Sequence, residues 1–242
     1  MKTKILLSFL LLLAIVVAGG FYFYQTKTSQ FVIQDKQIAD NTTPFVIKIS
    51  YPYINGLDDF NRKVKTIIDK EISDFKTNSL ENDKAVKDTD PTDYAKYPRT
   101  YELDISYDKG QVDGNIVSAM FNVYNFEGGA HGASYFVPLN YNVKTKTEIK
   151  LVDLFAGQSD YLQKISEFCI KDLTKQITDK LGDTSGTWIK DGAGPKEENF
   201  QFFLIGPPCK DSQLCRSMII FYFPQYQVAF GAAGDFKVVM PR

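Results

Sequence analysis

The sequence has few of the residues that hold metal ions or carry out nucleophilic and acid–base catalysis. Its 242 residues include a single histidine, His131, and three cysteines. Catalytic zinc sites usually take two or three histidines, so most zinc hydrolase sites are excluded. The sequence also lacks a nucleophile elbow of the form G-x-S-x-G, a P-loop and a dinucleotide-binding fingerprint. We therefore expect a protein with no metal ion and no cofactor.

An excess of positive charge is missing too. The chain has 28 lysines and arginines against 29 aspartates and glutamates. Domains that bind nucleic acids usually carry a basic face, so we expect no nucleic-acid partner. Hydrophobic residues make up 44% of the chain. That fraction, over roughly 200 residues, is enough for one sizeable core or two small lobes.

A long run without charge lies near the N-terminus. Ile5 to Tyr24 contains no charged residue and matches the thickness of a bilayer core. Two lysines precede the run and aromatic residues close it, which favours a single span with a cytoplasmic N-terminus. A signal peptide cleaved near Ala18 is the alternative. Both alternatives place residues 25–242 outside the cytoplasm, in a cell-membrane protein with an extracytoplasmic domain or in a secreted protein.

This pattern divides the chain into three parts. Residues 1–24 are the signal anchor or signal peptide, and residues 25–43 are a polar tether. Residues 44–242 form the extracytoplasmic domain. We expect two sub-lobes within that domain, at about 44–127 and 128–242.

The first half begins with a β-prone run at residues 45–51. From Leu57 to Phe75, apolar residues recur at spacings of three and four, which predicts one face of a helix. Residues 77–98 are polar and contain two prolines, which predicts a surface loop.

Strand patterns follow this loop. Residues 101–108 alternate apolar and polar side chains, which is typical of a half-buried strand. Turn-forming residues at 108–110 and 113–115 lead into a second strand at 116–126. A glycine-rich loop then leads into a third antiparallel strand at 134–143.

The sequence of the second half predicts one helix and further strands. Asp160 and Gln163 have the spacing of a capping box at the start of the helix, and Gly182 ends it. The expected strands cover residues 199–205, 216–223 and 236–240. The predicted fold class is α+β, a mainly antiparallel sheet with one long helix in each half, preceded by the N-terminal membrane segment.

The three cysteines have different expected roles. Cys209 and Cys215 flank a short loop between two strands, and in an exported protein this predicts a disulfide worth about 2 kcal/mol. Cys169 lies on the apolar face of the second helix, which predicts a buried free thiol. A nucleophilic role for Cys169 would require His131 beside it.

The glycine-rich loop at residues 128–132 holds the histidine. In one interpretation His131, Gly129 and Glu127 contact a ligand, because exposed loops often carry binding residues. In the other, His131 bonds to the backbone while the glycines supply positive φ angles.

A pair of carboxylates is one catalytic arrangement that the sequence leaves open. Asp104, Glu127 and Asp153 are candidates for the acid and base of glycoside hydrolysis. Ordinary surface or turn roles are the alternative for all three.

Three segments together resemble a known family. The loop GGAHG at residues 128–132, the helix start LVDLF at 151–155 and the C-terminal run from Tyr226 to Gly234 carry the resemblance. The chain is similar to the extracytoplasmic domain of RsiV-like anti-sigma factors, which bind lysozyme, and to the accessory region of PdaC-like peptidoglycan deacetylases. Lys146 stands where that family usually has glycine.

The resemblance implies an ectodomain without the other parts of its relatives. Only Met1 to Lys4 precede the apolar run, which leaves no segment to hold a sigma factor, and no deacetylase domain with several histidines follows. We expect a non-enzymatic, membrane-tethered binding module of the bacterial cell envelope, whose partner is a lysozyme-like protein or a cell-wall glycan. The alternatives are a carboxylate-dependent enzyme acting on envelope polysaccharide and a structural envelope protein.

Overall fold

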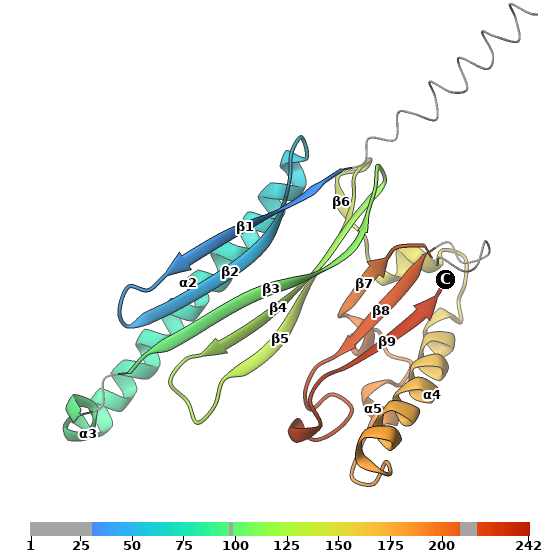
Figure 1. The fold of residues 1–242 in the computed structure, drawn as a ribbon. Helices are drawn as coiled ribbons and strands as arrows, with labels where there is room; N and C mark the ends of the chain where they lie inside the picture. Colours follow the sequence, from blue (N-terminus) through green and yellow to red (C-terminus); the bar gives the residue numbers. More distant parts are fainter. Residues whose placement is uncertain (1–30, 97–98, 209–216) are drawn as a thin grey trace, which may run out of the picture.

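A computed structural model describes residues 31–96, 99–208 and 217–242. These residues form two β-sheets, each covered by one long helix (Figure 1). The predicted membrane segment at residues 5–24 and the predicted Cys209–Cys215 disulfide lie outside the described residues. Within the described part of the chain, no helix combines the length and the apolar character needed to cross a membrane.

The larger sheet has six strands in the order of the sequence. They are β1 (Ile33–Asp40), β2 (Phe45–Ile54), β3 (Tyr101–Val112), β4 (Ile116–Phe126), β5 (Ala133–Asn142) and β6 (Thr147–Glu148). Neighbouring strands are antiparallel except β2 and β3, which run parallel because helix α2 (Asp58–Thr89) connects them. The α+β class is confirmed, and the sheet is mixed.

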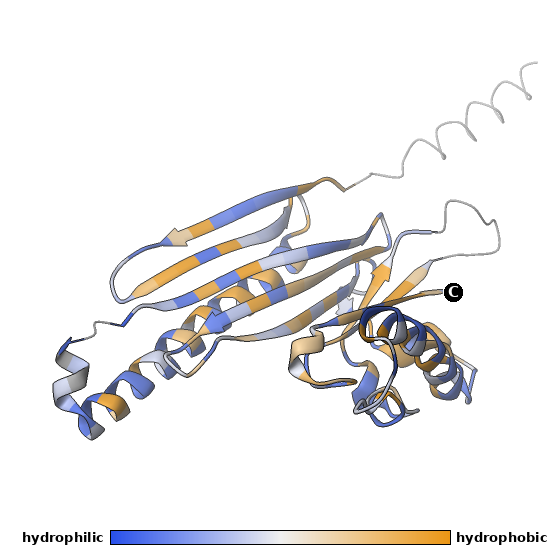
Figure 2. Cartoon of the chain, turned by 60° about the horizontal axis from the view of Figure 1, so that its bottom comes forward, coloured by the Kyte–Doolittle hydropathy of each residue, from blue (hydrophilic) through white to orange (hydrophobic). Residues whose placement is uncertain are grey.

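Helix α2 packs along one face of this sheet. Its buried apolar residues include Phe60, Val64 and Ile68, in the spacing that predicted the helix. They contact inward-facing strand residues such as Leu103 and Phe121. The strands alternate hydrophobic and hydrophilic residues, as Figure 2 shows, so the other face of the sheet is more polar.

The predicted surface loop at residues 77–98 was wrong. Helix α2 continues to Thr89, and α3 (Pro91–Lys96) follows it. The apolar stripe stops at Phe75, and beyond it the helix is stabilised by polar contacts such as the Lys84–Asp88 ion pair at 2.5 Å. A mostly exposed helix lacks the regularly spaced apolar residues by which a buried helix is recognised in a sequence.

The prediction of a polar tether at residues 25–43 was wrong for residues 33–40. Residues 33–40 form strand β1, which pairs with β2 from Ile33 opposite Ile54 to Asp40 opposite Ile47. This strand lies at the edge of the sheet and is largely exposed, so it shows no strict alternation of apolar and polar residues.

The second sheet belongs to the C-terminal part. Its strands β7 (Phe203–Gly206), β8 (Met218–Phe223) and β9 (Phe236–Pro241) are antiparallel in that order. Before them come the 3₁₀ helix η1 (Leu151–Phe155), α4 (Tyr161–Leu181), α5 (Ile189–Gly192) and the 3₁₀ helix η2 (Glu197–Phe200), and η3 (Gly231–Ala233) precedes β9.

Helix α4 covers this sheet with the predicted apolar stripe. Ile165, Cys169 and Leu173 are buried, and Gly182 ends the helix with φ 90°. The predicted capping box was wrong, because the Asp160 carboxylate pairs with Lys164 at 3.0 Å and makes no cap hydrogen bond. Cys169 is a free, fully buried thiol, as predicted, and burial raises its pKa, so the thiol is unreactive.

The second sheet packs against the face of the first sheet that lies opposite α2. At this contact a Cβ atom on Gly110 would lie 2.4 Å from the Ile205 carbonyl oxygen, so only glycine fits. The predicted turn at 108–110 was therefore wrong, because β3 runs through Gly110 to Val112. Nearby, the buried Asn140 donates to the Phe203 carbonyl at 2.8 Å and accepts from the Ile205 N–H at 3.1 Å.

Candidate functional site

The three residues predicted to bind a partner lie at the loop between β4 and β5. Gly128 has φ 90°, and its carbonyl accepts a hydrogen bond from Arg99 at 3.3 Å. His131 is exposed, and its Nδ1 lies 2.9 Å from the Gly132 carbonyl oxygen. Gly129 is open, with only the His131 carbonyl within 4 Å of an added Cβ. A binding role for this loop stays a prediction.

Helix α2 holds this loop from its polar second half. The Glu127 carboxylate accepts hydrogen bonds from Asn125 at 2.9 Å and from Asn78 at 3.4 Å. Asn82 donates to the Glu127 backbone carbonyl at 3.0 Å. Sequence reasoning missed Asn78 and Asn82, because neither belongs to a periodic pattern.

The three candidate catalytic carboxylates occupy different places. Asp153 accepts a hydrogen bond from the Lys150 N–H at 2.8 Å and so holds the start of η1. Glu127 contacts α2, whereas Asp104 lies on the opposite face of the first sheet. The structure therefore assembles no acid–base pair from these three residues. Among the described residues, no group of three or more histidine, cysteine, aspartate or glutamate side chains is placed to hold a metal ion.

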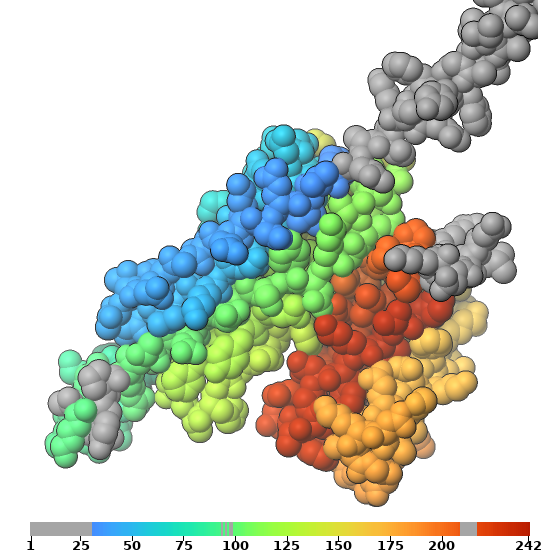
Figure 3. All heavy atoms as spheres, viewed as in Figure 1, coloured from blue at the N-terminus to red at the C-terminus, as the bar shows by residue number. Residues whose placement is uncertain are grey.

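Asp104 faces an open cleft of about 540 Å³ between the two sheets. Figure 3 shows the hollow between the strands β3 to β5 and the C-terminal strands. We call it the intersheet cleft. It is lined by Glu102, Asp104, Ser106, Asn122, Val123, Tyr124, Ser134, Tyr135, Phe136, Asp235 and Lys237.

Asp108 connects the two sheets beside this cleft. Its carboxylate accepts hydrogen bonds from Lys237 at 2.6 Å and from the Tyr222 hydroxyl at 2.7 Å. Burial by itself would raise the pKa of Asp108, but these two donors outweigh it and the net effect lowers the pKa. The carboxylate is therefore ionised at neutral pH and neutralises Lys237.

A second candidate is a patch of exposed aromatic side chains on the C-terminal part. We call residues 224–230, between β8 and η3, the aromatic loop. Tyr226 in this loop is 62% exposed and Phe230 is 40% exposed, and Trp188, just before α5, is 37% exposed. Tyr226 has φ 70°, a left-handed backbone conformation that side chains other than glycine rarely adopt.

Hydrogen bonds fix the aromatic loop in this conformation. Trp188 donates from its indole Nε1 to the Tyr226 carbonyl at 2.8 Å, and its backbone N–H bonds to the Val228 carbonyl at 3.1 Å. The Gln227 amide donates to the carbonyls of Gly192 and Asn199, both at 2.8 Å. Segments distant in the sequence thus impose the strained backbone at Tyr226.

Glycine makes room for the exposed tyrosine. A Cβ atom on Gly231 would lie 2.3 Å from the Tyr226 ring, so the ring rests directly on this glycine. A pocket of about 510 Å³ adjoins Trp188. It is lined by Ile170, Thr174, Thr184, Thr187, Trp188, Ile189, Lys190 and Asp191.

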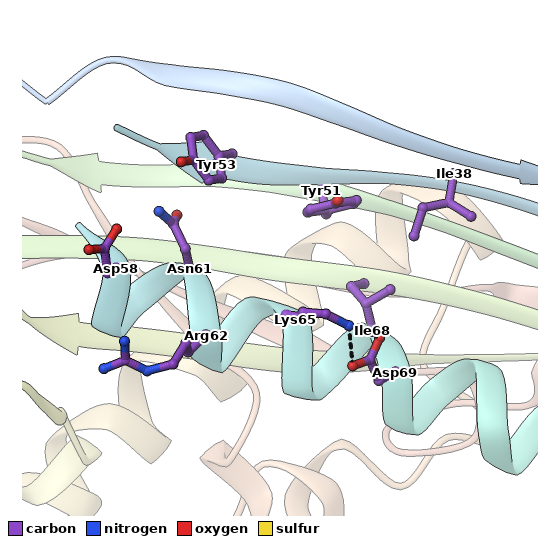
Figure 4. Close-up of a pocket in the computed structure, with 9 residues that line it drawn as sticks. All are labelled: Ile38, Tyr51, Tyr53, Asp58, Asn61, Arg62, Lys65, Ile68 and Asp69. Carbon is purple, nitrogen blue, oxygen red and sulfur yellow. Dashed lines mark hydrogen bonds and ion pairs between the residues drawn. The ribbon is translucent and has the colours of Figure 1, made fainter. Parts of the chain in front are cut away.

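A smaller groove of about 330 Å³ lies between the ribbon β1–β2 and α2 (Figure 4). The rings of Tyr51 and Tyr53 stand over it from β2. Lys65 pairs with Asp69 at 2.7 Å, and the Asn61 side chain bonds to the Ile54 backbone at 2.9 and 2.7 Å. Because these polar groups are satisfied within the protein, the groove is a weaker candidate than the other two surfaces.

Two family models match the chain one after the other. Residues 38–134 match the family described as Deacetylase PdaC. Residues 152–242 match the family described as Protein of unknown function (DUF3298). The first part of the chain therefore matches the PdaC family and the last part the DUF3298 family, which confirms the resemblance to the PdaC-like accessory region.

A curated relative and a solved structure agree with this assignment. The chain is 25% identical over 205 residues to peptidoglycan-N-acetylmuramic acid deacetylase PdaC of Bacillus subtilis (strain 168), an alignment that covers 85% of this chain and 39% of the relative. The chain thus spans about two fifths of that relative's length. A crystal structure of a DUF3298 family member from Bacteroides fragilis NCTC 9343 has a TM-score of 0.57 and 16% identity, covering 89% of this chain and 92% of the other. This similarity shows the fold.

Proposed function

We propose that the chain is a non-enzymatic accessory module of the bacterial cell envelope, and that it binds a partner through the aromatic loop and Trp188. The PdaC and DUF3298 domains support the envelope role, since the relative with the same domain is named for its action on peptidoglycan. The apolar run at residues 5–24 supports a tether to the membrane.

The conformation of Tyr226 is the observation that carries the proposal. A left-handed backbone costs a side chain other than glycine about 1–2 kcal/mol. The ring is 62% exposed, so burial returns little of this energy in the free protein. Strained residues of this kind persist where their surroundings impose them, and they cluster at functional sites. We therefore assign Tyr226 to partner binding.

The exposed aromatic side chains of this loop favour a partner with a groove. Tyr226 and Phe230 lie on the loop between β8 and β9 at the end of the second sheet (Figure 1). Tryptophan and tyrosine are enriched among residues that dominate protein–protein binding energy. A lysozyme-like protein has a groove that binds a glycan, and the aromatic loop is a fitting occupant for it. Because the loop is already rigid, binding requires little further ordering.

A cell-wall glycan is the second candidate. The pocket beside Trp188 is lined by Thr174, Thr184 and Thr187, whose hydroxyl groups can bond to sugar hydroxyls while the indole ring stacks on a sugar face. In both cases the module binds without performing chemistry. The separation of Asp104, Glu127 and Asp153 supports that part of the proposal.

Binding of the purified protein to each partner tests the proposal. Calorimetric titration with a lysozyme and sedimentation with purified peptidoglycan are both performed on the wild type, Tyr226→Ala and Phe168→Ala. Phe168 on α4 is also exposed, at 37%, but lies outside the aromatic loop, so it is the matched control. We expect Tyr226→Ala to weaken binding about tenfold or more, with Phe168→Ala close to the wild type. Absence of binding to both partners by the wild type would sink the proposal.

A further inference from the structure

The intersheet cleft carries an unbalanced negative charge. Glu102 and Asp104 project from β3, and Asp235 precedes β9 on the opposite wall. All three residues are exposed. Within the described residues, neither Glu102 nor Asp104 forms an ion pair, and Asp235 only accepts a hydrogen bond from the Gln225 N–H at 2.9 Å. Three carboxylates thus face one cleft, and none of them forms an ion pair within the described residues.

Among the described residues, Lys237 is the single cation that lines this cleft, and its charge is already neutralised. Lys237 lies 2.6 Å from the Asp108 carboxylate. That pair carries no net charge, so it leaves the charge of Glu102, Asp104 and Asp235 unchanged. The cleft is therefore complementary to a cationic ligand.

The other polar groups that line the intersheet cleft indicate what kind of ligand fits it. Ser106, Asn122 and Ser134 come from three neighbouring strands, β3, β4 and β5, and the exposed ring of Tyr124 lies among them. Neighbouring strands are about 4.8 Å apart, so hydroxyl, amide and carboxylate groups are spread over a flat sheet surface. No three acidic side chains of the described chain gather closely enough to hold a metal ion. This arrangement suits an extended ligand that carries both hydroxyl groups and separated positive charges.

We infer that the intersheet cleft binds an oligosaccharide bearing protonated amino groups, which is a glycan from which N-acetyl groups have been removed. Its amines pair with Glu102, Asp104 and Asp235, its hydroxyls bond to the serines and Asn122, and one sugar face stacks on Tyr124. A fully acetylated glycan has no charge to offer the three carboxylates and binds more weakly. The inference adds a second site to the proposed function and rests on it only for the cell-wall origin of the glycan.

Two probes of equal length test the charge requirement. One is an oligomer of β-1,4-linked glucosamine and the other is the same oligomer fully N-acetylated, both titrated calorimetrically into the whole chain at mildly acidic pH. We expect the amine-bearing oligomer to bind about tenfold more tightly than the acetylated one, with an affinity that falls as salt is added. Equal affinities for the two oligomers would overturn the inference.

Substitutions test the site. Glu102→Gln and Asp104→Asn keep the shape of exposed side chains, and each should weaken binding of the glucosamine oligomer several-fold, with a larger loss in the double variant. Glu198→Gln removes an exposed carboxylate outside the cleft and is the matched control. Wild-type affinity in the double variant, with an unchanged unfolding temperature, would assign the binding elsewhere and refute the site.

An oligolysine of equal charge tests the saccharide requirement. We expect it to bind more weakly than the glucosamine oligomer, because it lacks hydroxyl groups for Ser106, Asn122 and Ser134. Tighter binding of oligolysine would mean that the cleft takes a basic peptide, which contradicts the inference. The proposed function is tested with lysozyme and with peptidoglycan, and its variants lie in the aromatic loop. The two proposals can therefore fail separately.

Discussion

The indole Nε1 of Trp188 donates a hydrogen bond to the carbonyl oxygen of Tyr226 at 2.8 Å. This bond joins the start of α5 to the loop between β8 and β9, two segments that are 38 positions apart. It fixes the peptide group that follows Tyr226 and so helps to hold the left-handed backbone at this residue. The exposed aromatic patch is therefore built before any partner arrives.

Replacing Tyr226 separates its backbone strain from the function of its ring. Tyr226→Gly relieves the left-handed strain, whereas Tyr226→Ala keeps it, so we expect the glycine variant to be the more stable by about 1 kcal/mol. Urea denaturation measures this difference. Both variants lack the ring and should lose partner binding equally. A glycine variant less stable than the alanine variant would show that the backbone there is not strained.

Lys146 is the other described residue, apart from glycines, with a positive φ, at 61°. It occupies the position where the family usually has glycine, and its Nζ pairs with Asp59 at 2.9 Å. Hydrogen bonding to Lys146 lowers the pKa of Asp59. We expect Lys146→Gly to raise the urea midpoint in high salt, where the ion pair is screened and relief of strain remains.

Lys144→Gly is the control for that experiment, because Lys144 lies in the same turn with an ordinary φ. It should lower the midpoint or leave it unchanged. An equal rise in both variants would mean that the turn gains from glycine in general, and not from relief of strain at Lys146.

The lowered pKa of Asp108 predicts a dependence of stability on pH. A carboxylate whose pKa is lower in the folded state stabilises the fold above the unfolded value of about 3.9, and this contribution is lost as the pH falls through the folded pKa. We expect Asp108→Asn to reduce the loss of stability on acidification from near-neutral pH. Thermal unfolding at a series of pH values measures it. Asp104→Asn, which removes a carboxylate without an ion pair in the described chain, should leave the slope close to that of the wild type.

The buried contact of Asn140 between the two sheets predicts a large loss of stability when this side chain is truncated. Asn140→Ala leaves the Phe203 carbonyl without a donor and removes one of two acceptors for the Ile205 N–H, the other being the Ser118 hydroxyl at 3.0 Å. Each unsatisfied buried group costs about 1–3 kcal/mol, so we expect a loss of about 2–4 kcal/mol in chemical denaturation. Ser106→Ala, at an exposed position, should change stability by less than about 0.5 kcal/mol. A small effect of Asn140→Ala would mean that the hydrogen bonds of Asn140 contribute little to the contact between the two sheets.

Elements with a strong periodic pattern could be predicted from the sequence. The strand predicted at residues 116–126 has the same limits as β4, and the α4 stripe through Ile165, Cys169 and Leu173 is buried as expected. Both elements bury one face, and this burial requires apolar residues at the regular spacing of a strand or a helix. The polar end of α2 and the edge strand β1 bury little, so their sequences carry no such signal.

The candidate sites depend on contacts between distant segments, which the sequence does not display. Gly110 looks like a turn glycine, and only its approach to Ile205 shows why it lies in a strand. Tyr226 was identified only as a residue matched by the resemblance, since its strain comes from Trp188, Gly192 and Asn199. The carboxylates of the intersheet cleft come from β3 and from the residue before β9, which are far apart in the chain.

Competition for a lysozyme tests the central claim most directly. If the aromatic loop enters the groove of a lysozyme-like protein, then an oligosaccharide inhibitor that fills that groove must compete with it. The calorimetric Kd of the wild-type chain for the lysozyme should rise in proportion to the inhibitor concentration. A Kd that stays constant while the groove is saturated with inhibitor would contradict the account.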